Sequence, residues 1–117
     1  MIRAELHLDS HMCLRGLVVE GHAAKGSPGL SVPCAAVSAL VRTSSRLIAA
    51  EQGVVSSGEA EKEGRLKLQV KHCAPPYREW LRGITDFVVV GLKEIERDYP
   101  DDCVVELYTQ EENRNGA

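Results

Sequence analysis

The sequence predicts a small α/β protein, a two-layer sandwich in which two helices pack on one face of a mixed or antiparallel sheet. Five short segments have the alternation or the composition of strands. Two longer segments space their apolar residues three and four apart, as amphipathic helices do. The resulting order is strand, strand, helix, strand, strand, helix, strand. Elements in this order bury their apolar faces best as one sheet covered by two helices.

The size and charge of the chain narrow the functional classes. Its 117 residues are enough for one domain, which we assign to residues 1–110, with the polar segment 111–117 as a disordered tail. The formal net charge of -3 and the lack of a basic run argue against direct nucleic-acid binding. No segment is apolar enough for a signal peptide or a membrane span, so we expect a cytoplasmic protein.

The first half of the chain reads as a hairpin followed by a helix. Every even position of residues 2–8 is apolar, which predicts a strand, and a turn at 9–11 leads to a second strand at 14–20. A helix is expected from Pro33 to Glu51 or Gln52, with Gly53 beyond its end. Its apolar face is expected to contain Val37, Leu40, Val41, Ser44, Leu47 and Ile48.

The second half repeats this order and adds one strand. Strands are expected at 54–57 and 65–71, joined through the polar segment 59–64, and a last strand at 103–108. Between them, Pro75 and Pro76 open a second helix that ends at the segment 99–102. The β-branched run at 87–90 could belong to a strand, but the helical stripe continues through it. That stripe consists of Tyr77, Trp80, Leu81, Ile84, Val88, Leu92 and Ile95.

Cys34 is the first candidate functional residue, because it lies in the first turn of the predicted helix. Ser31 is expected to cap that helix, and Pro33 suits its first turn. A helix N-terminus carries partial positive charge and backbone N–H groups that lack intrahelical partners. Both favour a thiolate over a thiol, and the N–H groups could hold an oxyanion. Cys34 is therefore a candidate nucleophile.

His22 is the candidate general base. It follows the second predicted strand, and a strand end and a helix start joined by a loop can lie side by side. His22 could then take the thiol proton and return it to a leaving amine. Gly26 and Gly29 would let the connecting loop open and close over a peptide. The competing interpretation is that Cys34 is a small core residue and His22 a surface turn residue.

Metal and phosphate chemistry find less support. The cysteines include no CxxC pair, and in a reducing compartment they are expected to be thiols. His11 and Cys13 are two apart and His72 and Cys73 are adjacent, and neither spacing suits tetrahedral zinc, so we expect no metal. The glycines near His22 also lack the order of a phosphate-binding loop.

The segments GHA at 21–23 and CAAVSAL at 34–40, with Gly29 between them, resemble the signature of the ribosomal-processing cysteine protease family. The resemblance implies a homodimeric bacterial endopeptidase that needs no cofactor. Its substrate would be the precursor of ribosomal large-subunit protein twenty-seven, from which it trims an N-terminal extension. It also implies that Cys34 is the nucleophile and His22 the general base. The implied supporting or substrate-binding residues are Gly21, Gly26, Gly29, Ser31 and Ser38.

Ser31 departs from the family pattern, which usually has an acidic residue three positions before the cysteine. A serine can cap the helix but cannot supply a negative charge. Two alternatives therefore stay open: a non-catalytic ribosome- or precursor-binding module of the same fold, and a thiol-based redox or zinc protein. For the dimer, the apolar stripe of the second helix and the last strand are candidate interfaces.

Overall fold

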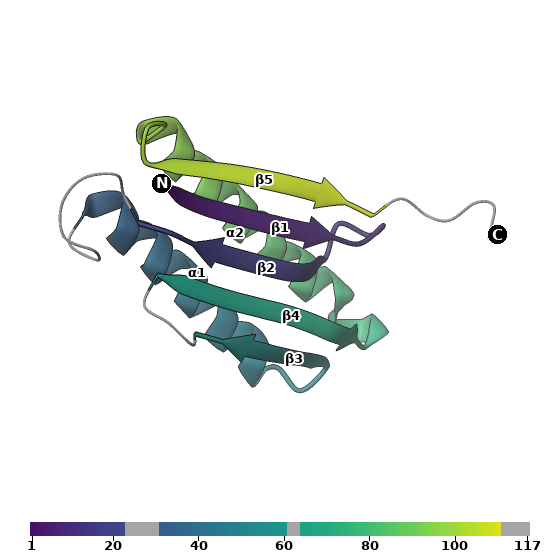
Figure 1. Ribbon diagram of the computed structural model, residues 1–117. Helices are drawn as coiled ribbons and strands as arrows, with labels where there is room; N and C mark the ends of the chain where they lie inside the picture. The colour runs from purple at the N-terminus through teal and green to yellow at the C-terminus, as the bar shows by residue number, and fades with distance from the viewer. Residues whose placement is uncertain (23–30, 61–63, 111–117) are drawn as a thin grey trace.

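The computed structural model describes residues 1–22, 31–60 and 64–110. Two helices lie on one face of a five-stranded sheet (Figure 1), which confirms the expected two-layer α/β architecture and element order. The predicted disorder of residues 111–117 falls outside the described residues. The elements are β1 (Ile2–Leu8), β2 (Leu14–Glu20), α1 (Val32–Ala50), β3 (Val54–Glu59), β4 (Arg65–Cys73), the 3₁₀ turn η1 (Pro75–Tyr77), α2 (Arg78–Asp98) and β5 (Cys103–Thr109).

The sheet is mixed, with the strand order β3-β4-β2-β1-β5. Only the pairing of β1 with β5 is parallel, and the other three pairings are antiparallel. The register aligns leucines across the four strands from β5 to β4. Leu6 lies opposite Leu107 on one side and Leu17 on the other, and Leu17 lies opposite Leu68. Leu6, Leu17 and Leu68 of this row are buried and belong to the core, whereas Leu107 on the edge strand is 38% exposed.

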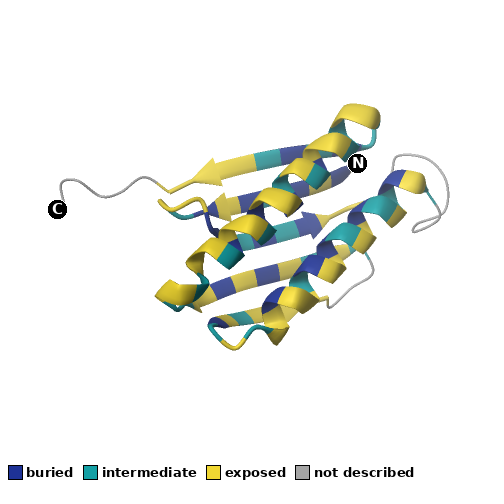
Figure 2. Cartoon of the chain, turned by 180° about the vertical axis from the view of Figure 1, so that it is seen from behind, coloured by how far each residue is buried: buried dark blue, intermediate teal, exposed yellow. Residues whose placement is uncertain are grey.

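Helix α1 packs on the sheet through a narrower face than the sequence predicts. Val37, Val41, Ser44 and Ile48 are buried, but the side chain of Leu47 is 48% exposed. Successive helical residues point about 100° apart, so Leu47 points away from the sheet when Ile48 points into it. Figure 2 shows the buried positions of both helices turned toward the strands.

Helix α2 confirms most of the predicted stripe, since Leu81, Val88 and Leu92 are buried. The predicted start of this helix was wrong. Pro75 and Pro76 belong to the 3₁₀ turn η1, and the α-helix begins at Arg78. Proline has no N–H to donate, which favours a separate short turn here.

The stripe also omitted Thr85, which is fully buried. Its Oγ1 donates to the carbonyl oxygen of Leu81 at 2.8 Å and accepts from the backbone N–H of Leu14 at 2.9 Å. Both hydrogen bonds of the Thr85 hydroxyl are buried. A polar side chain therefore links α2 to the first residue of β2.

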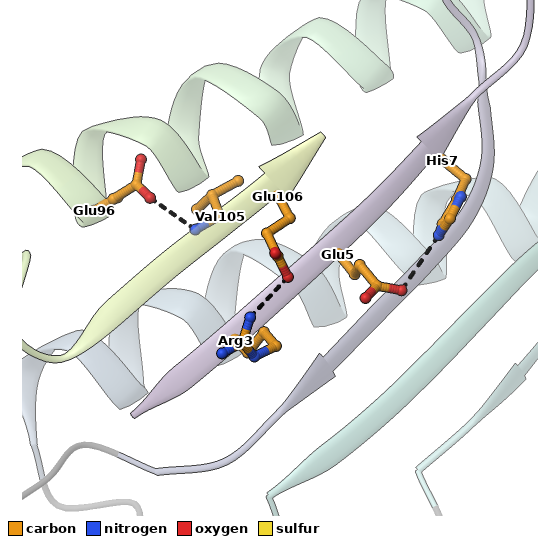
Figure 3. A network of polar contacts seen from close by, with 6 residues as sticks. All are labelled: Arg3, Glu5, His7, Glu96, Val105 and Glu106. Carbon is orange, nitrogen blue, oxygen red and sulfur yellow. Dashed lines mark hydrogen bonds and ion pairs between the residues drawn. The ribbon is translucent and has the colours of Figure 1, made fainter. Parts of the chain in front are cut away.

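The open face of the sheet is polar. On β1, the side chains of Arg3, Glu5 and His7 alternate with the buried ones (Figure 3). Arg3 pairs with Glu106 of β5 at 2.8 Å, and His7 lies 3.3 Å from Glu5. Within the described residues, no helix is long and apolar enough to cross a membrane.

Candidate active site

The end of β2 and the start of α1 lie at the same end of the sheet (Figure 1). Residues of both elements line a cavity of about 250 Å³. Four segments line it: the start of β1, the end of β2, the first turns of α1 and the start of β4. His22, Cys34 and Ser38 supply polar groups to its wall. Its apolar lining consists of Ile2, Val19, Val37, Val41 and Leu66.

Cys34 is positioned by the N-terminal cap of α1. The Ser31 hydroxyl accepts a hydrogen bond from the Cys34 backbone N–H at 3.2 Å, and the Ser31 carbonyl accepts one from Ala35 at 3.0 Å. The predicted serine cap is thus confirmed. This cap also leaves fewer backbone N–H groups at the start of α1 that could bind an oxyanion. Pro33 has no N–H, and that of Cys34 is already bonded to Ser31.

His22 is held where β2 meets the start of β4. Gly21 has a φ of 97°, and its N–H donates to the Gly64 carbonyl oxygen at 2.9 Å. The Met1 amino nitrogen donates to the His22 carbonyl oxygen. Positive φ at Gly21 turns the chain out of β2, which is a conformation that glycine adopts without strain. This turn directs His22 toward the cavity rather than along the sheet.

Gly64 lies directly against the imidazole ring of His22. A Cβ atom built on Gly64 would overlap Nε2 of that ring and would lie 2.5 Å from Cε1. The φ of Gly64 is 80°, so both its backbone and its close contact require glycine. Gly64 was expected only as part of the segment 59–64 that joins two strands, not as a site residue. Its place directly before the strand at 65–71 does not by itself indicate a contact with His22.

The structure brings most of the predicted site residues together. Gly21, His22, Cys34 and Ser38 line one cavity, and Ser31 bonds to Cys34 beside it. The remaining two, Gly26 and Gly29, lie outside the described residues.

A second cavity, of about 440 Å³, lies by the turn between β1 and β2, at the other end of the sheet. It is lined in part by His11, Cys13, His72 and Cys73, the two pairs considered for zinc. In the described part of the chain, however, no three His, Cys, Asp or Glu side chains gather as metal ligands. Burial raises the pKa of the Cys13 and Cys73 thiols. These two cysteines therefore behave as packing residues.

A cysteine at the start of a helix and a histidine in the same pocket form an arrangement that cysteine peptidases use. The family comparison agrees with this class. Residues 1–104 match the cysteine protease Prp family, and the chain belongs to that family.

Solved structures share the fold. The ribosomal processing protease Prp from S. aureus, with a covalently linked product peptide, has a TM-score of 0.76 and 18% identity, covering 92% of this chain and 99% of that one. The same protein with a substrate peptide gives 0.72 at 18% identity, with the same coverage. SMU.848 from Streptococcus mutans gives 0.74 at 21% identity, covering 94% of this chain and 96% of that one. A search of curated protein sequences finds no match.

Proposed function

We propose that this protein is a cysteine endopeptidase that removes an N-terminal extension from ribosomal large-subunit protein twenty-seven during ribosome maturation. The observation that carries the proposal is the shared cavity of His22 and Cys34 in a chain of the cysteine protease Prp family. The S. aureus relative is a ribosomal processing protease that holds a substrate peptide and a covalently linked product peptide. These two peptide complexes of the relative support a peptide as the ligand of this cavity.

In this proposal the thiol and the imidazole act in two stages. The Cys34 thiol loses its proton to His22, and its sulfur bonds to the scissile carbonyl carbon. His22 then gives that proton to the leaving amine as the C–N bond breaks, which leaves a thioester on Cys34. In the second stage His22 takes a proton from water, and the hydroxide attacks the thioester. The acid product leaves, and the proton returns to the sulfur of Cys34.

Ser31 accepts the hydrogen bond of one backbone N–H, that of Cys34, which the oxyanion of the tetrahedral intermediate would also use. Its hydroxyl now accepts the Cys34 N–H, the donor closest to the nucleophile along the chain. When the Ser31 side chain rotates away, that N–H is released for the oxyanion, whose negative charge makes a stronger acceptor than a hydroxyl. The cap and the oxyanion therefore compete for one N–H group.

The test is cleavage of a synthetic peptide that spans the junction between extension and mature protein, followed by mass spectrometry. Wild type is expected to give two products, and Cys34→Ser and His22→Ala are expected to give none within the same time. Cys73→Ser and His72→Ala are the matched controls, because both residues line the second cavity. Equal cleavage by wild type and Cys34→Ser would contradict the proposal.

A non-catalytic precursor-binding module is the second candidate. The observation that favours it is the small number of donors at the start of α1, where Ser31 occupies the Cys34 N–H. Fluorescence anisotropy of the labelled junction peptide separates the two functions. A binding module holds the intact peptide without releasing products, and Cys34→Ser changes nothing. A protease releases products in the wild type, while Cys34→Ser only binds.

We also propose that the protein is a homodimer and works in the cytoplasm, where reducing conditions keep its four thiols unpaired by disulfides. Of the two expected interfaces, the buried residues of the α2 stripe face the sheet, while β5 is an edge strand on which Leu107 and Tyr108 are exposed. The outer face of α2 adds a third candidate surface, on which Phe87 and Val90 are 60% and 59% exposed. Light scattering of wild type and Phe87→Glu tests this: the variant is expected to be monomeric.

A further inference from the structure

The cavity that holds His22 and Cys34 is cationic, although the chain as a whole carries a formal net charge of -3. Arg42 and Arg65 line it, and none of the described residues that line it is an aspartate or a glutamate. Ser31, which occupies the position of an acidic residue in the family pattern, adds no negative charge beside it. A cavity with this lining favours an anionic ligand group over a cationic one.

Arg42 is the better placed of the two cations. Its Nε donates to the Ser38 hydroxyl at 3.1 Å, which ties the guanidinium to the turn of α1 that follows Cys34. Within the described residues Arg42 forms no ion pair, so its charge is not neutralised there. Arg65 is paired with Glu20 at 3.8 Å, with both side chains half exposed. Arg42 therefore supplies most of the uncompensated charge.

The spacing along α1 sets which part of a peptide Arg42 can reach. One helical turn separates Ser38 from Cys34, a rise of about 6 Å. In an extended peptide, side chains two residues apart point to the same side and are about 6.7 Å apart. A peptide that lies along α1 with its scissile bond at Cys34 would bring a side chain two residues from that bond close to the guanidinium bound at Ser38.

We propose that Arg42 is a specificity-determining residue that selects an acidic side chain, Asp or Glu, two residues from the scissile bond. A guanidinium can bond a carboxylate through two parallel N–H groups, which rewards an acidic side chain over its neutral amide. The Nε bond to Ser38, between two exposed side chains of α1, favours a guanidinium orientation beside the turn that follows Cys34. This inference rests on the proposed peptidase function and names the substrate feature that the enzyme reads.

The experiment compares a cleavable junction peptide with variants that carry Glu, Gln or Lys two residues before or two residues after the scissile bond. Wild type is expected to cleave one of the Glu peptides with a kcat/KM about tenfold above its Gln counterpart, the size of one charge-assisted hydrogen bond. Arg42→Gln is expected to remove this preference, and Arg42→Glu to prefer Lys. Arg46→Gln is the matched control, because Arg46 is an exposed arginine of α1 like Arg42 but does not line the cavity.

Two outcomes overturn the inference: equal rates for Glu and Gln at both positions, or a preference that persists in Arg42→Gln. The same peptides are also measured by anisotropy on the Cys34→Ser protein, with and without Arg42→Gln. If no peptide is cleaved, the proposed function fails, and these binding constants still decide the role of Arg42. A Glu preference in binding that disappears with Arg42→Gln supports it, and uniform binding refutes it.

Discussion

Replacing Gly64 by alanine tests how His22, the proposed general base, is held. The added Cβ would lie 2.5 Å from Cε1 of His22, whereas an unstrained contact needs about 3.4 Å. The ring must therefore move by about 1 Å, a displacement that can lower a catalytic rate about 100-fold, or about 2.7 kcal/mol. The left-handed backbone of Gly64 adds a separate loss of stability of about 1–2 kcal/mol.

The assay must separate the moved ring from the strained backbone. We expect the rate of Cys34 alkylation at pH 7, and kcat/KM where a substrate peptide is in hand, to fall in Gly64→Ala. In a His22→Ala background the same substitution should leave the alkylation rate unchanged and still lower the melting temperature. Gly58→Ala is the control, since the nearest atom to its added Cβ is 3.7 Å away. The reasoning is refuted if Gly64→Ala stays folded and alkylates Cys34 at the wild-type rate.

Three further predictions follow from the described contacts. Mass-resolved alkylation at pH 7 should modify Cys34 faster than the other three cysteines. Burial raises the pKa of the Cys13, Cys73 and Cys103 thiols, which lowers the fraction of reactive thiolate at that pH; equal rates at all four cysteines would contradict this. Ser31→Ala should destabilise the protein by about 1 kcal/mol, or about 4 °C in Tm, while Ser31→Asp keeps the cap and the Tm. Thr85→Val leaves the buried N–H of Leu14 without its acceptor and should cost about 1–3 kcal/mol in urea unfolding, whereas Thr85→Ser should retain most of the stability.

The sequence allowed the element order and most of the core to be predicted, because burial follows the two periods of strand and helix. Ile48 and Leu92 are buried as their spacing predicts, but Leu47 is exposed, since a spacing pattern does not fix how wide the buried face is. Thr85, in contrast, is buried although it was not predicted to be. Its hydroxyl is satisfied in the core by the Leu81 carbonyl within α2 and by the Leu14 N–H, and the second contact joins segments distant in sequence.

Some residues of the candidate site could likewise be predicted from the sequence, and others could not. Cys34 and Ser31 could be predicted because a helix cap is a local pattern of a few residues. Gly64 and Arg42 could not, because their roles depend on where β4 and the first turns of α1 lie relative to His22. The register between β2 and β4 places Gly64 beside that histidine, and register is a property of the folded sheet rather than of either strand.

The cavity draws every one of its described lining residues from the first 66 positions of the chain. Helix α2 and strand β5 complete the core but contribute none of these residues. In the proposed dimer, substitutions on the outer surface of α2 would alter the association of two copies and leave the proposed peptide site unchanged. The residues of the proposed site and those of the proposed interface then lie in different parts of the sequence. Under these two proposals, self-association and substrate choice can evolve separately.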